Sequence, residues 1–405
     1  MKTIVIGGGA AGMIAAIFQA RQGADVTIIE KNEKLGKKIY ITGKGRCNLT
    51  NDCSSENVLL NVVSNSKFLI SSVNAFSPTN VMAFFEELGL MIKTERGNRV
   101  FPVSDKSSDV IKVLKSEIER LGVKVNYNET ATALLVNEDR INGIITDKTE
   151  YFADKVIVAT GGLSYPSTGS TGDGYKFAKS VWHTVTALYP SLCGFNLKGE
   201  DYSELQGLTL KNVKVTLYDN GKNYYEEQGE MLFTHYGVSG PLILTGSALT
   251  ARKNLQNITL EIDFKPALST KQLDARILRD FQTANNKEIK NVLDALLPKA
   301  VIPLMLKRAK IPEYKKVSVI TAEERSRLVQ TLKCLTFTVN SLRGYNEAVI
   351  TSGGISVKEI NPKTMESKLI KGLHFVGEVL DIDAFTGGFN LQIAFSTGYM
   401  AGKSL

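Results

Sequence analysis

The chain has 405 residues, of which 43% are hydrophobic and 22% are charged, and its formal net charge at pH 7 is +8. This length indicates two or three domains, and this balance is that of an ordinary globular protein. The four cysteines form no CxxC pair and only three histidines are present, so neither a zinc site nor a disulfide framework is expected. No long apolar run occurs, so no membrane span is expected. We expect a cytoplasmic protein.

The N-terminal segment is predicted to form a strand, a glycine turn and a helix. Residues 3–6 are an apolar run, and residues 7–12 carry glycines in GxGxxG spacing. Residues 26–29 form a second apolar run that ends in Glu30. The segment lacks a clear basic n-region and a cleavage site, which argues against a signal peptide. The order of strand, glycine turn, helix and acid-terminated strand is typical of dinucleotide binding.

Each residue of this fingerprint has a physical role. Gly7 permits the tight turn, Gly9 lets a pyrophosphate approach the backbone, and Gly12 lets the helix pack on the strand. The helix N-terminus presents free N–H groups to the phosphates. We expect Glu30 to accept hydrogen bonds from the hydroxyls of an adenosine ribose.

A basic stretch follows and ends in the string GKGRCNLTN. Residues 31–46 contain six Lys or Arg and one Glu. We expect Arg46 to lower the pKa of the Cys47 thiol, which makes Cys47 a hypothetical proton donor. The alternative is that Cys47 is a small buried residue behind the cofactor. In that case Arg46 and Lys44 anchor a phosphate or the cofactor.

A second strand and glycine turn lie in the middle of the chain. Residues 156–162 read VIVATGG, the type of turn that returns the chain to the cofactor in flavoproteins with two dinucleotide-binding folds. Residues 167–178 then open a helix, in which Asp173 is placed to cap the N-terminus. Asp173 is therefore either a cap alone or a cofactor ligand as well.

The region 190–336 is predicted to be an insert. Strand-rich segments come first and helical segments follow, an order that fits a β-barrel with a helical part. The strands are expected at 213–218, 230–234 and 257–263, and the helices at the capping boxes Ser269–Gln272 and Thr321–Glu324 and at 298–310.

The insert carries a second basic stretch. Residues 299–316 contain six Lys or Arg and one Glu, as residues 31–46 do. One interpretation is a solvated surface whose charges pair with acids elsewhere. The other is a surface that binds the phosphates of a polyanion.

The C-terminal region is predicted to complete the nucleotide-binding fold. Residues 373–402 read as a strand, a glycine turn, a polar loop and a helix, and Glu378 or Asp381 is expected to bind the ribityl chain. Upstream, Tyr345 and Asn346 are candidates for lining the pocket. No second GxGxxG follows another strand, so a separate domain for NAD(P)H is not expected.

Five strings together resemble one known family. GGGAAGM, GKGRCNLTN, ATGGLSYPSTGSTGDGY, MLFTHYGVSGPLIL and GEVLDIDAFTGGFNLQIAFSTG are similar to those of BaiN/RdsA-type (YhiN-like) FAD-dependent flavoproteins, and the similarity extends over essentially the whole chain. The resemblance implies an α/β fold with a two-dinucleotide-binding, Rossmann-like FAD domain and an inserted β-barrel plus helical subdomain. The expected ranges are 1–189 and 337–405 for the FAD domain, 190–266 for the barrel and 267–336 for the helical part.

The resemblance also implies the chemistry. Members are NAD(P)H-dependent reductases of carbon–carbon double bonds, with non-covalently bound FAD and substrates that include bile-acid enones and a uridine of 23S ribosomal RNA. Catalytic candidates are Cys47, Arg46, Tyr345 and Asn346. The residues expected to bind FAD are Gly7, Gly9, Ala10, Ala11, Gly12, Glu30, Lys31, Gly43, Gly45, Arg46, Cys47, Thr160, Gly161, Gly162, Asp173, Gly377, Glu378, Asp381, Gly387, Gly388, Phe389, Asn390 and Leu391.

Four alternatives stay open from the sequence. A reductase of small enones predicts a closed apolar pocket, whereas an enzyme acting on ribosomal RNA predicts an open site ringed by Lys and Arg. An RNA-binding factor with a structural flavin predicts no turnover with NAD(P)H, and an oxidase predicts peroxide formation. Motifs do not indicate the preference between NADH and NADPH or the oligomeric state.

Overall fold

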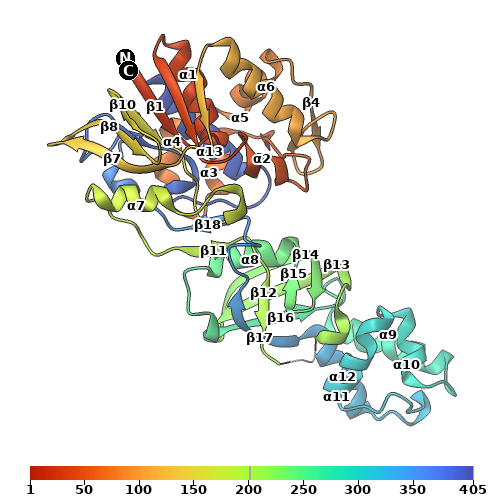
Figure 1. The fold of residues 1–405 in the computed structure, drawn as a ribbon. Coiled ribbons are helices and arrows are strands. Elements are labelled where there is room, and N and C mark those ends of the chain that lie inside the picture. Colours follow the sequence, from red (N-terminus) through yellow and green to blue (C-terminus); the bar gives the residue numbers. More distant parts are fainter. Residues whose placement is uncertain (200–201, 405) are drawn as a thin grey trace. The chain divides into compact units, whose positions relative to one another are not determined.

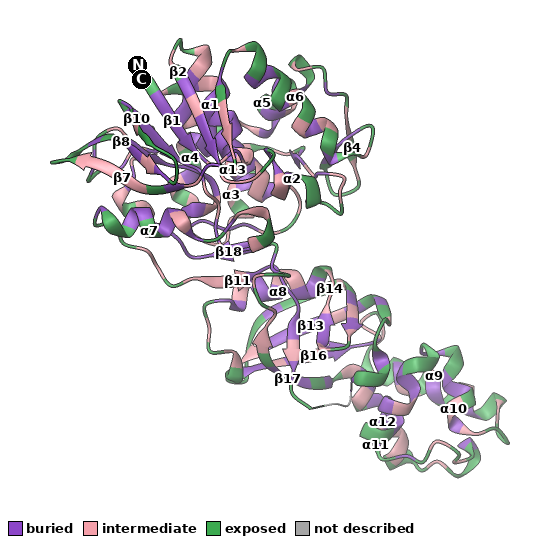
Figure 2. Cartoon of the chain, in the orientation of Figure 1, coloured by how far each residue is buried: buried purple, intermediate pink, exposed green. Residues whose placement is uncertain are grey.

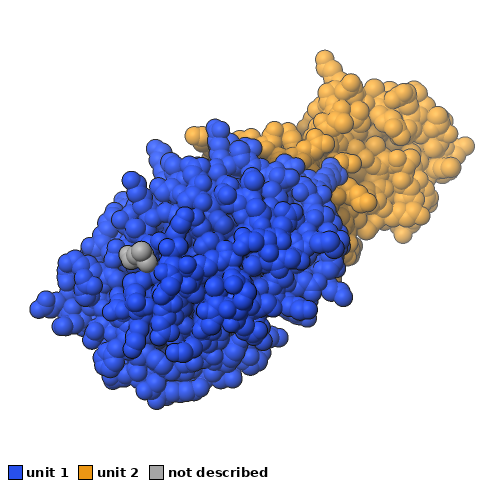
Figure 3. Space-filling model, turned by 90° about the horizontal axis from the view of Figure 1, so that it is seen from above, with its two compact units in different colours: residues 1–191, 344–405 blue, residues 192–343 orange. Residues whose placement is uncertain are grey.

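The computed structural model describes residues 1–199 and 202–404, which form two compact units (Figure 1). The first unit comprises residues 1–191 together with the C-terminal segment from residue 344 onward, and the second comprises residues 192–343 (Figure 3). The chain therefore leaves the first unit once and returns to it once.

A five-stranded parallel sheet forms the centre of the first unit, with strand order β19-β10-β1-β2-β6. Its strands are β1 (Lys2–Ile6), β2 (Asp25–Glu30), β6 (Lys124–Tyr127), β10 (Lys155–Val158) and β19 (Leu373–Phe375). The first and last parts of the chain thus share one sheet. This order confirms the predicted Rossmann-like domain, which is split by an insert.

Smaller sheets and helices surround this sheet. The strands are β3 (Thr50–Asn51), β4 (Ile92–Glu95) and β5 (Arg99–Pro102); β7 (Ala131–Asn137), β8 (Arg140–Thr146) and β9 (Glu150–Phe152); and β11 (Tyr189–Ser191) with β18 (Ile350–Ser352). The helices are α1 (Ala10–Arg21), α2 (Lys37–Ile41), α3 (Ser55–Leu60), α4 (Ile70–Ala75), α5 (Pro78–Glu87), α6 (Ser107–Arg120), α7 (Asp173–Ser180) and α13 (Phe389–Lys403).

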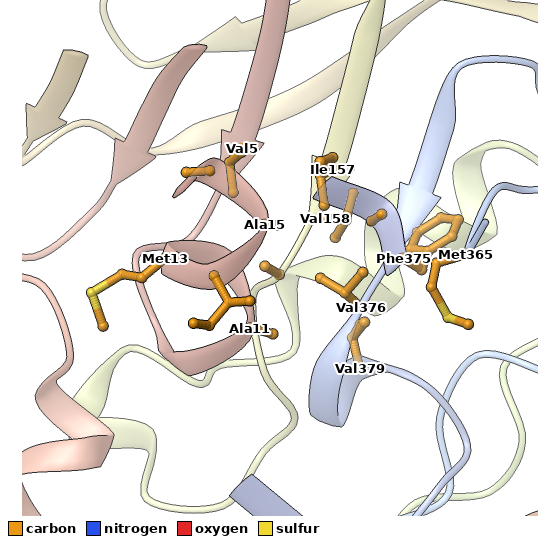
Figure 4. Packing of buried hydrophobic residues seen from close by; sticks show 14 of the residues in the cluster. Val5, Ala11, Met13, Ala15, Ile157, Val158, Met365, Phe375, Val376 and Val379 are labelled. Atoms are coloured by element: carbon orange, nitrogen blue, oxygen red, sulfur yellow. The ribbon is translucent and has the colours of Figure 1, made fainter. Parts of the chain in front are cut away.

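Helices α1 and α13 pack closely against each other. A Cβ atom at Gly398 would lie 2.4 Å from the Ala11 carbonyl oxygen, and one at Gly402 would lie 2.7 Å from that of Ala15. Only glycine fits at such distances. Buried apolar residues of α1, β1, β10 and β19 form the surrounding core (Figures 2 and 4).

The second unit contains a closed barrel with strand order β12-β15-β14-β13-β16-β17. Its strands are β12 (Phe195–Leu197), β13 (Thr209–Asp219), β14 (Lys222–Thr234), β15 (Gly237–Ser239), β16 (Ile258–Asp263) and β17 (Leu335–Leu342), and α8 (Pro241–Thr250) packs beside them. Strand β17 alternates buried and exposed residues along most of its length, as expected for a barrel wall. It begins at Leu335 and runs to Leu342, so the barrel continues past residue 336, the expected end of the insert.

Helices lie between the last two barrel strands. They are α9 (Thr270–Thr283), α10 (Ile289–Val292), α11 (Ile302–Ala309) and α12 (Ala322–Lys333). Both predicted capping boxes are confirmed, since the side chains of Ser269 and Thr321 accept hydrogen bonds from the amides of Gln272 and Glu324. We refer to residues 265–334 as the helical subdomain.

No single helix among residues 1–199 and 202–404 is long and apolar enough to cross a membrane. One bent pair, Ser66–Ala75 with Pro78–Glu87, meets the length and composition criteria jointly. Val73, Phe84 and Phe85 of this pair are buried in the core of the first unit. The pair is therefore built into the fold around the parallel sheet.

Candidate functional site

A cavity in the first unit lies where strands β1, β2 and β10 end and helices α1 and α13 begin. Ligands of open parallel sheets bind at such carboxyl ends. The residues of the cavity wall that were predicted to bind FAD are Gly7, Gly9, Ala10, Ala11, Glu30, Lys31, Thr160, Gly161, Asp173, Gly377, Glu378, Asn390 and Leu391. Residues from both ends of the chain therefore meet in one site.

Three glycines shape the wall in different ways. Gly7 has φ +100°, and a Cβ there would lie 2.7 Å from the Ala159 carbonyl oxygen. A Cβ on Gly12 would lie 1.9 Å from the carbonyl oxygen of Gly7, so the helix and the turn touch. A Cβ on Gly9 would meet no protein atom within 4 Å, although Gly9 lines the cavity. The open space at Gly9 is where a pyrophosphate approaches the backbone.

The N-termini of α1 and α13 both face this cavity. Their N-cap residues are Gly9 and Gly388, and neither helix has a side-chain cap or an acidic residue in its first turn. Ala10 and Ala11 of α1 and Asn390 and Leu391 of α13 line the wall. Uncapped helix N-termini carry partial positive charge and free N–H groups, so both favour an anionic ligand.

Glu30 organises the glycine turn. One carboxylate oxygen accepts a hydrogen bond from the Gly8 amide at 2.8 Å, and the other accepts bonds from the amide and side chain of Asn32 at 2.8 and 2.7 Å. Glu30 is buried and lines the cavity. The sequence predicts that Glu30 binds the ribose. The structure shows in addition that its carboxylate connects the glycine turn at Gly8 to the loop at Asn32.

Asp173 does not cap helix α7 as expected. Gly172 is the N-cap, and the Asp173 carboxylate instead accepts a hydrogen bond from Lys31 at 2.7 Å. Burial raises its pKa, but hydrogen bonds from Lys31, Thr171 and Lys176 outweigh burial and hold the pKa below the usual value. Asp173 therefore stays ionised on the wall. Thr160 lies on the same wall, but its hydroxyl oxygen is buried against Gly174 of α7 and has no hydrogen-bond partner among the described residues.

A polar network on the cavity wall was not anticipated from the sequence. The Lys38 ammonium donates to Glu378 at 2.5 Å and to the Ser164 hydroxyl at 2.5 Å. Ser164 in turn donates to Glu378 at 2.7 Å. In the sequence Lys38 is one cation of a basic stretch, and no local pattern signals that it meets an acid 340 positions later.

The GKGRC loop has an unusual backbone. Gly43, Lys44, Gly45 and Cys47 all have positive φ, between 59° and 83°. Left-handed conformations at residues with side chains cost energy and cluster at functional sites. The loop is therefore held in shape by its surroundings.

The expected activation of Cys47 by Arg46 is wrong. Arg46 donates to Glu95 and Asp105 at 2.5 Å each, and its guanidinium lies 4.1 Å from the ring centroid of Phe101. Its charge is therefore neutralised by acids. Cys47 has 0% exposure, and burial raises the pKa of its thiol to about 12. The thiol stays neutral at physiological pH.

Comparison with known proteins decides the family. The family described as "HI0933-like protein Rossmann domain" matches residues 1–404. The chain belongs to this HI0933-like family. The resemblance and the fold class predicted from the motifs are thereby confirmed.

Two relatives match over almost their whole length. A 3-dehydro-bile acid delta(4,6)-reductase of Clostridium scindens is 31% identical over 99% of this chain and 98% of the relative. A ribosomal RNA dihydrouridine synthase of Haemophilus influenzae is 30% identical over 100% of this chain and 98% of the relative. Among solved structures, a 3-ketosteroid-delta4-(5alpha)-dehydrogenase from Rhodococcus jostii superposes with a TM-score of 0.54 at 17% identity, covering 99% of this chain and 95% of that one.

The HI0933-like chain is an FAD-dependent oxidoreductase, and its cavity fits the cofactor. The open space at Gly9 leaves room for a pyrophosphate, and the two uncapped helix N-termini favour anionic groups such as a pyrophosphate and an anionic ring system. Glu30 lies where the adenosine ribose is expected.

Several predicted residues of the HI0933-like chain lie outside the cavity wall. The residues that do not line the cavity are Gly12, Gly43, Gly45, Arg46, Cys47, Gly162, Asp381, Gly387, Gly388, Phe389, Tyr345 and Asn346. Gly12 and Gly388 instead permit close packing against backbone, and Gly162 leaves room for the side chain of Thr351. Asn346 is exposed and Tyr345 is half-buried. The cofactor and catalytic roles assigned to these residues stay predictions.

Proposed function

We propose that this protein uses NAD(P)H and FAD to reduce an activated carbon–carbon double bond, and that its substrate is a uridine of large-subunit ribosomal RNA. The two curated relatives above, one named for a bile-acid reduction and one for dihydrouridine synthesis, support reduction of such bonds. A ribosomal RNA substrate also agrees with the cytoplasmic location expected from the cysteine pattern.

The observation that carries the substrate assignment is the charge distribution. The helical subdomain, residues 265–334, contains 15 Lys or Arg and 7 Asp or Glu. Residues 191–264 contain 6 Lys or Arg and 9 Asp or Glu. The helical subdomain thus carries +8, which equals the formal net charge of the whole chain. Positive charge concentrated in one part of a protein is the signature expected for a polyanionic partner.

Reduction of the double bond requires a hydride, a proton and hydrogen-bond donors at the carbonyl. When bound, FAD supplies the hydride chemistry, taking a hydride from NAD(P)H and delivering it to the double bond. Reduction of a uracil C5–C6 bond also requires a proton at the other carbon and hydrogen-bond donors at the carbonyl. The uncapped N-terminus of α13 offers backbone N–H groups to an anion, and Lys38 places an ammonium on the wall. The proton donor among Cys47, Arg46, Tyr345 and Asn346 stays a hypothesis.

The test is the dihydrouridine content of large-subunit ribosomal RNA, measured by nucleoside mass spectrometry in cells with and without the gene. We expect the modification to be lost on deletion and restored by the wild-type gene. A variant that binds no FAD should fail to restore it. Unchanged dihydrouridine on deletion would overturn the RNA assignment.

A small enone is the second candidate substrate, because the relative named for a bile-acid reduction is as similar as the one named for an RNA modification. An assay of NAD(P)H oxidation by the purified holoenzyme with a 3-keto-4-ene steroid distinguishes the two candidate substrates. Only an enone reductase consumes NADPH or NADH when the steroid is added. Rapid peroxide formation without another acceptor would indicate an oxidase. Absence of any NAD(P)H oxidation would indicate a flavin-containing RNA-binding factor.

A further inference from the structure

The acids of the helical subdomain neutralise only part of its positive charge. Six of its seven acids pair with a Lys or Arg of the same subdomain at 2.6–3.5 Å, as in Asp274 with Arg325 and Glu324 with Lys315. The exposed cations for which the described residues offer no acidic partner are Lys271, Arg279, Lys287, Lys310 and Lys316. These side chains are free to bind an external anion.

Four of these cations follow one edge of the helical subdomain. On α9 the buried side is formed by Leu273, Ile277 and Phe281, and Lys271 and Arg279 lie on the exposed side. Eight residues of helix separate them, a rise of about 12 Å. Lys287 comes just after the end of α9, with its amide bonded to the Ala284 carbonyl at 2.8 Å.

The fourth cation, Lys316, is held next to this edge by backbone pairing. The Val317 amide donates to the Lys287 carbonyl at 3.0 Å, the Ile289 amide donates to the Lys315 carbonyl at 2.9 Å, and Glu288 and Lys316 form an antiparallel bridge. Lys287 and Lys316 therefore project from two segments that are fixed to each other. We call Lys271, Arg279, Lys287 and Lys316 the α9 edge.

An exposed aromatic ring adjoins the α9 edge. Tyr314 is 69% exposed, and the Lys290 ammonium lies 3.9 Å from its ring centroid. Lys290 is also paired with Glu288 at 3.4 Å, so it fixes the ring rather than adding a free charge. An exposed ring beside a row of cations is the arrangement that binds a nucleic acid, with bases stacked on the ring and phosphates on the cations.

We propose that the α9 edge, with Tyr314, is a docking surface for the phosphate backbone of RNA. This inference rests on the proposed function, since it assigns to one surface the partner named there. Each cation that contacts a phosphate releases a counterion, so the logarithm of affinity falls with the logarithm of salt concentration. The ring contributes stacking, which depends little on salt.

The experiment measures binding of the full-length holoprotein to a fluorescent stem-loop transcribed from large-subunit ribosomal RNA, at several salt concentrations. The variant Arg279→Ala/Lys287→Ala/Lys316→Ala should weaken binding at least tenfold and reduce the salt slope by about three. Tyr314→Ala should weaken binding by about five- to a hundredfold and leave the salt slope unchanged. FAD content and the thermal unfolding midpoint verify that the variants fold.

A matched control uses three exposed lysines of the barrel part, Lys198→Ala/Lys211→Ala/Lys222→Ala, for which the described residues offer no acidic partner. This triple removes the same charge from the same unit. Equal weakening by both triples would show that only overall charge matters and would overturn the proposal, as would unchanged binding by the α9-edge triple. Binding of vesicles containing anionic phospholipid in place of the stem-loop would also overturn it.

The outcomes separate this proposal from the proposed function. If deletion of the gene leaves dihydrouridine unchanged but the α9-edge triple loses RNA affinity, the docking surface stands and the substrate assignment fails. If deletion removes dihydrouridine but the triple binds RNA like the wild type, the substrate assignment stands and the docking surface fails.

Discussion

Two regions beside the cofactor cavity are built on different principles. The glycine turn at residues 7–12 is built from backbone, because its geometry depends on missing Cβ atoms and on free N–H groups. The region around Lys38 and the GKGRC loop is built from side chains that pair with residues far away in the chain. The comparison teaches that backbone-built sites are visible in short strings, whereas side-chain networks are not.

The largest effect should come from breaking the backbone-built region at Gly12. In Gly12→Ala the new methyl group would meet the Gly7 carbonyl oxygen at 1.9 Å. We expect the free energy of unfolding to fall by about 3 kcal/mol or more, with loss of bound FAD. Chemical denaturation measures this fall. A variant as stable as the wild type would show that turn and helix separate easily.

Gly9→Ala should weaken binding of the cofactor and leave the fold intact. Gly9 has φ −82° and its Cβ would meet only open space, so the apoprotein should lose no more than about 1 kcal/mol. The methyl group would stand where the pyrophosphate approaches, and we expect FAD affinity to fall about five- to a hundredfold. Flavin fluorescence titration measures the affinity. Tight FAD binding by Gly9→Ala would place the pyrophosphate elsewhere.

Lys38→Met tests the region built from side chains. It would leave the nearly buried Glu378 carboxylate, 11% exposed, without its cation. We expect the unfolding free energy of the apoprotein to fall by about 1–2 kcal/mol, less than for a fully buried pair. Lys37→Met is the matched control, because its partner Glu33 is 59% exposed and the change should cost less than about 0.5 kcal/mol. Equal effects would show that the Lys38 network adds no stability.

The smallest effect is expected at Cys47. Burial raises the pKa of its thiol to about 12, so the neutral form is present throughout pH 6–9 and no thiolate contributes to the pH profile. Turnover of Cys47→Ala should stay within about threefold of the wild type, and the folded protein should protect this thiol from an aromatic disulfide reagent. A loss of turnover that Cys47→Ser partly restores would revive the proton-donor hypothesis.

Much of the fold was predictable because it is local. The strand at β1, the glycine turn, the capping boxes at Ser269 and Thr321 and the strand-rich segments of the insert all follow from short-range periodicity and turn chemistry. Barrel closure by β17 was not predictable, because β17 pairs with β12 and β16, which both precede the helical subdomain, whereas β17 follows it.

The site was predictable in part for the same reason. Gly7, Gly9 and Glu30 line the cavity as expected, because a fixed spacing after a strand carries them there. The Lys31–Asp173 and Arg46–Glu95 pairs join segments 142 and 49 positions apart, which no single string encodes. Sequence adjacency gives the wrong pKa direction at Cys47, because the Arg46 guanidinium pairs with Glu95 and Asp105, which are distant in the chain.

The close packing of α1 and α13 has a consequence for how the enzyme is made. Helix α1 and its glycine turn leave the ribosome early, but the other helix N-terminus of the cavity belongs to α13, with the whole inserted unit synthesised between them. Until α13 docks through Gly398 and Gly402, the cavity lacks one wall and its apolar neighbours stay open to water. Flavin insertion is therefore a late step of biosynthesis, and ribosome-bound chains that end before α13 should carry no flavin.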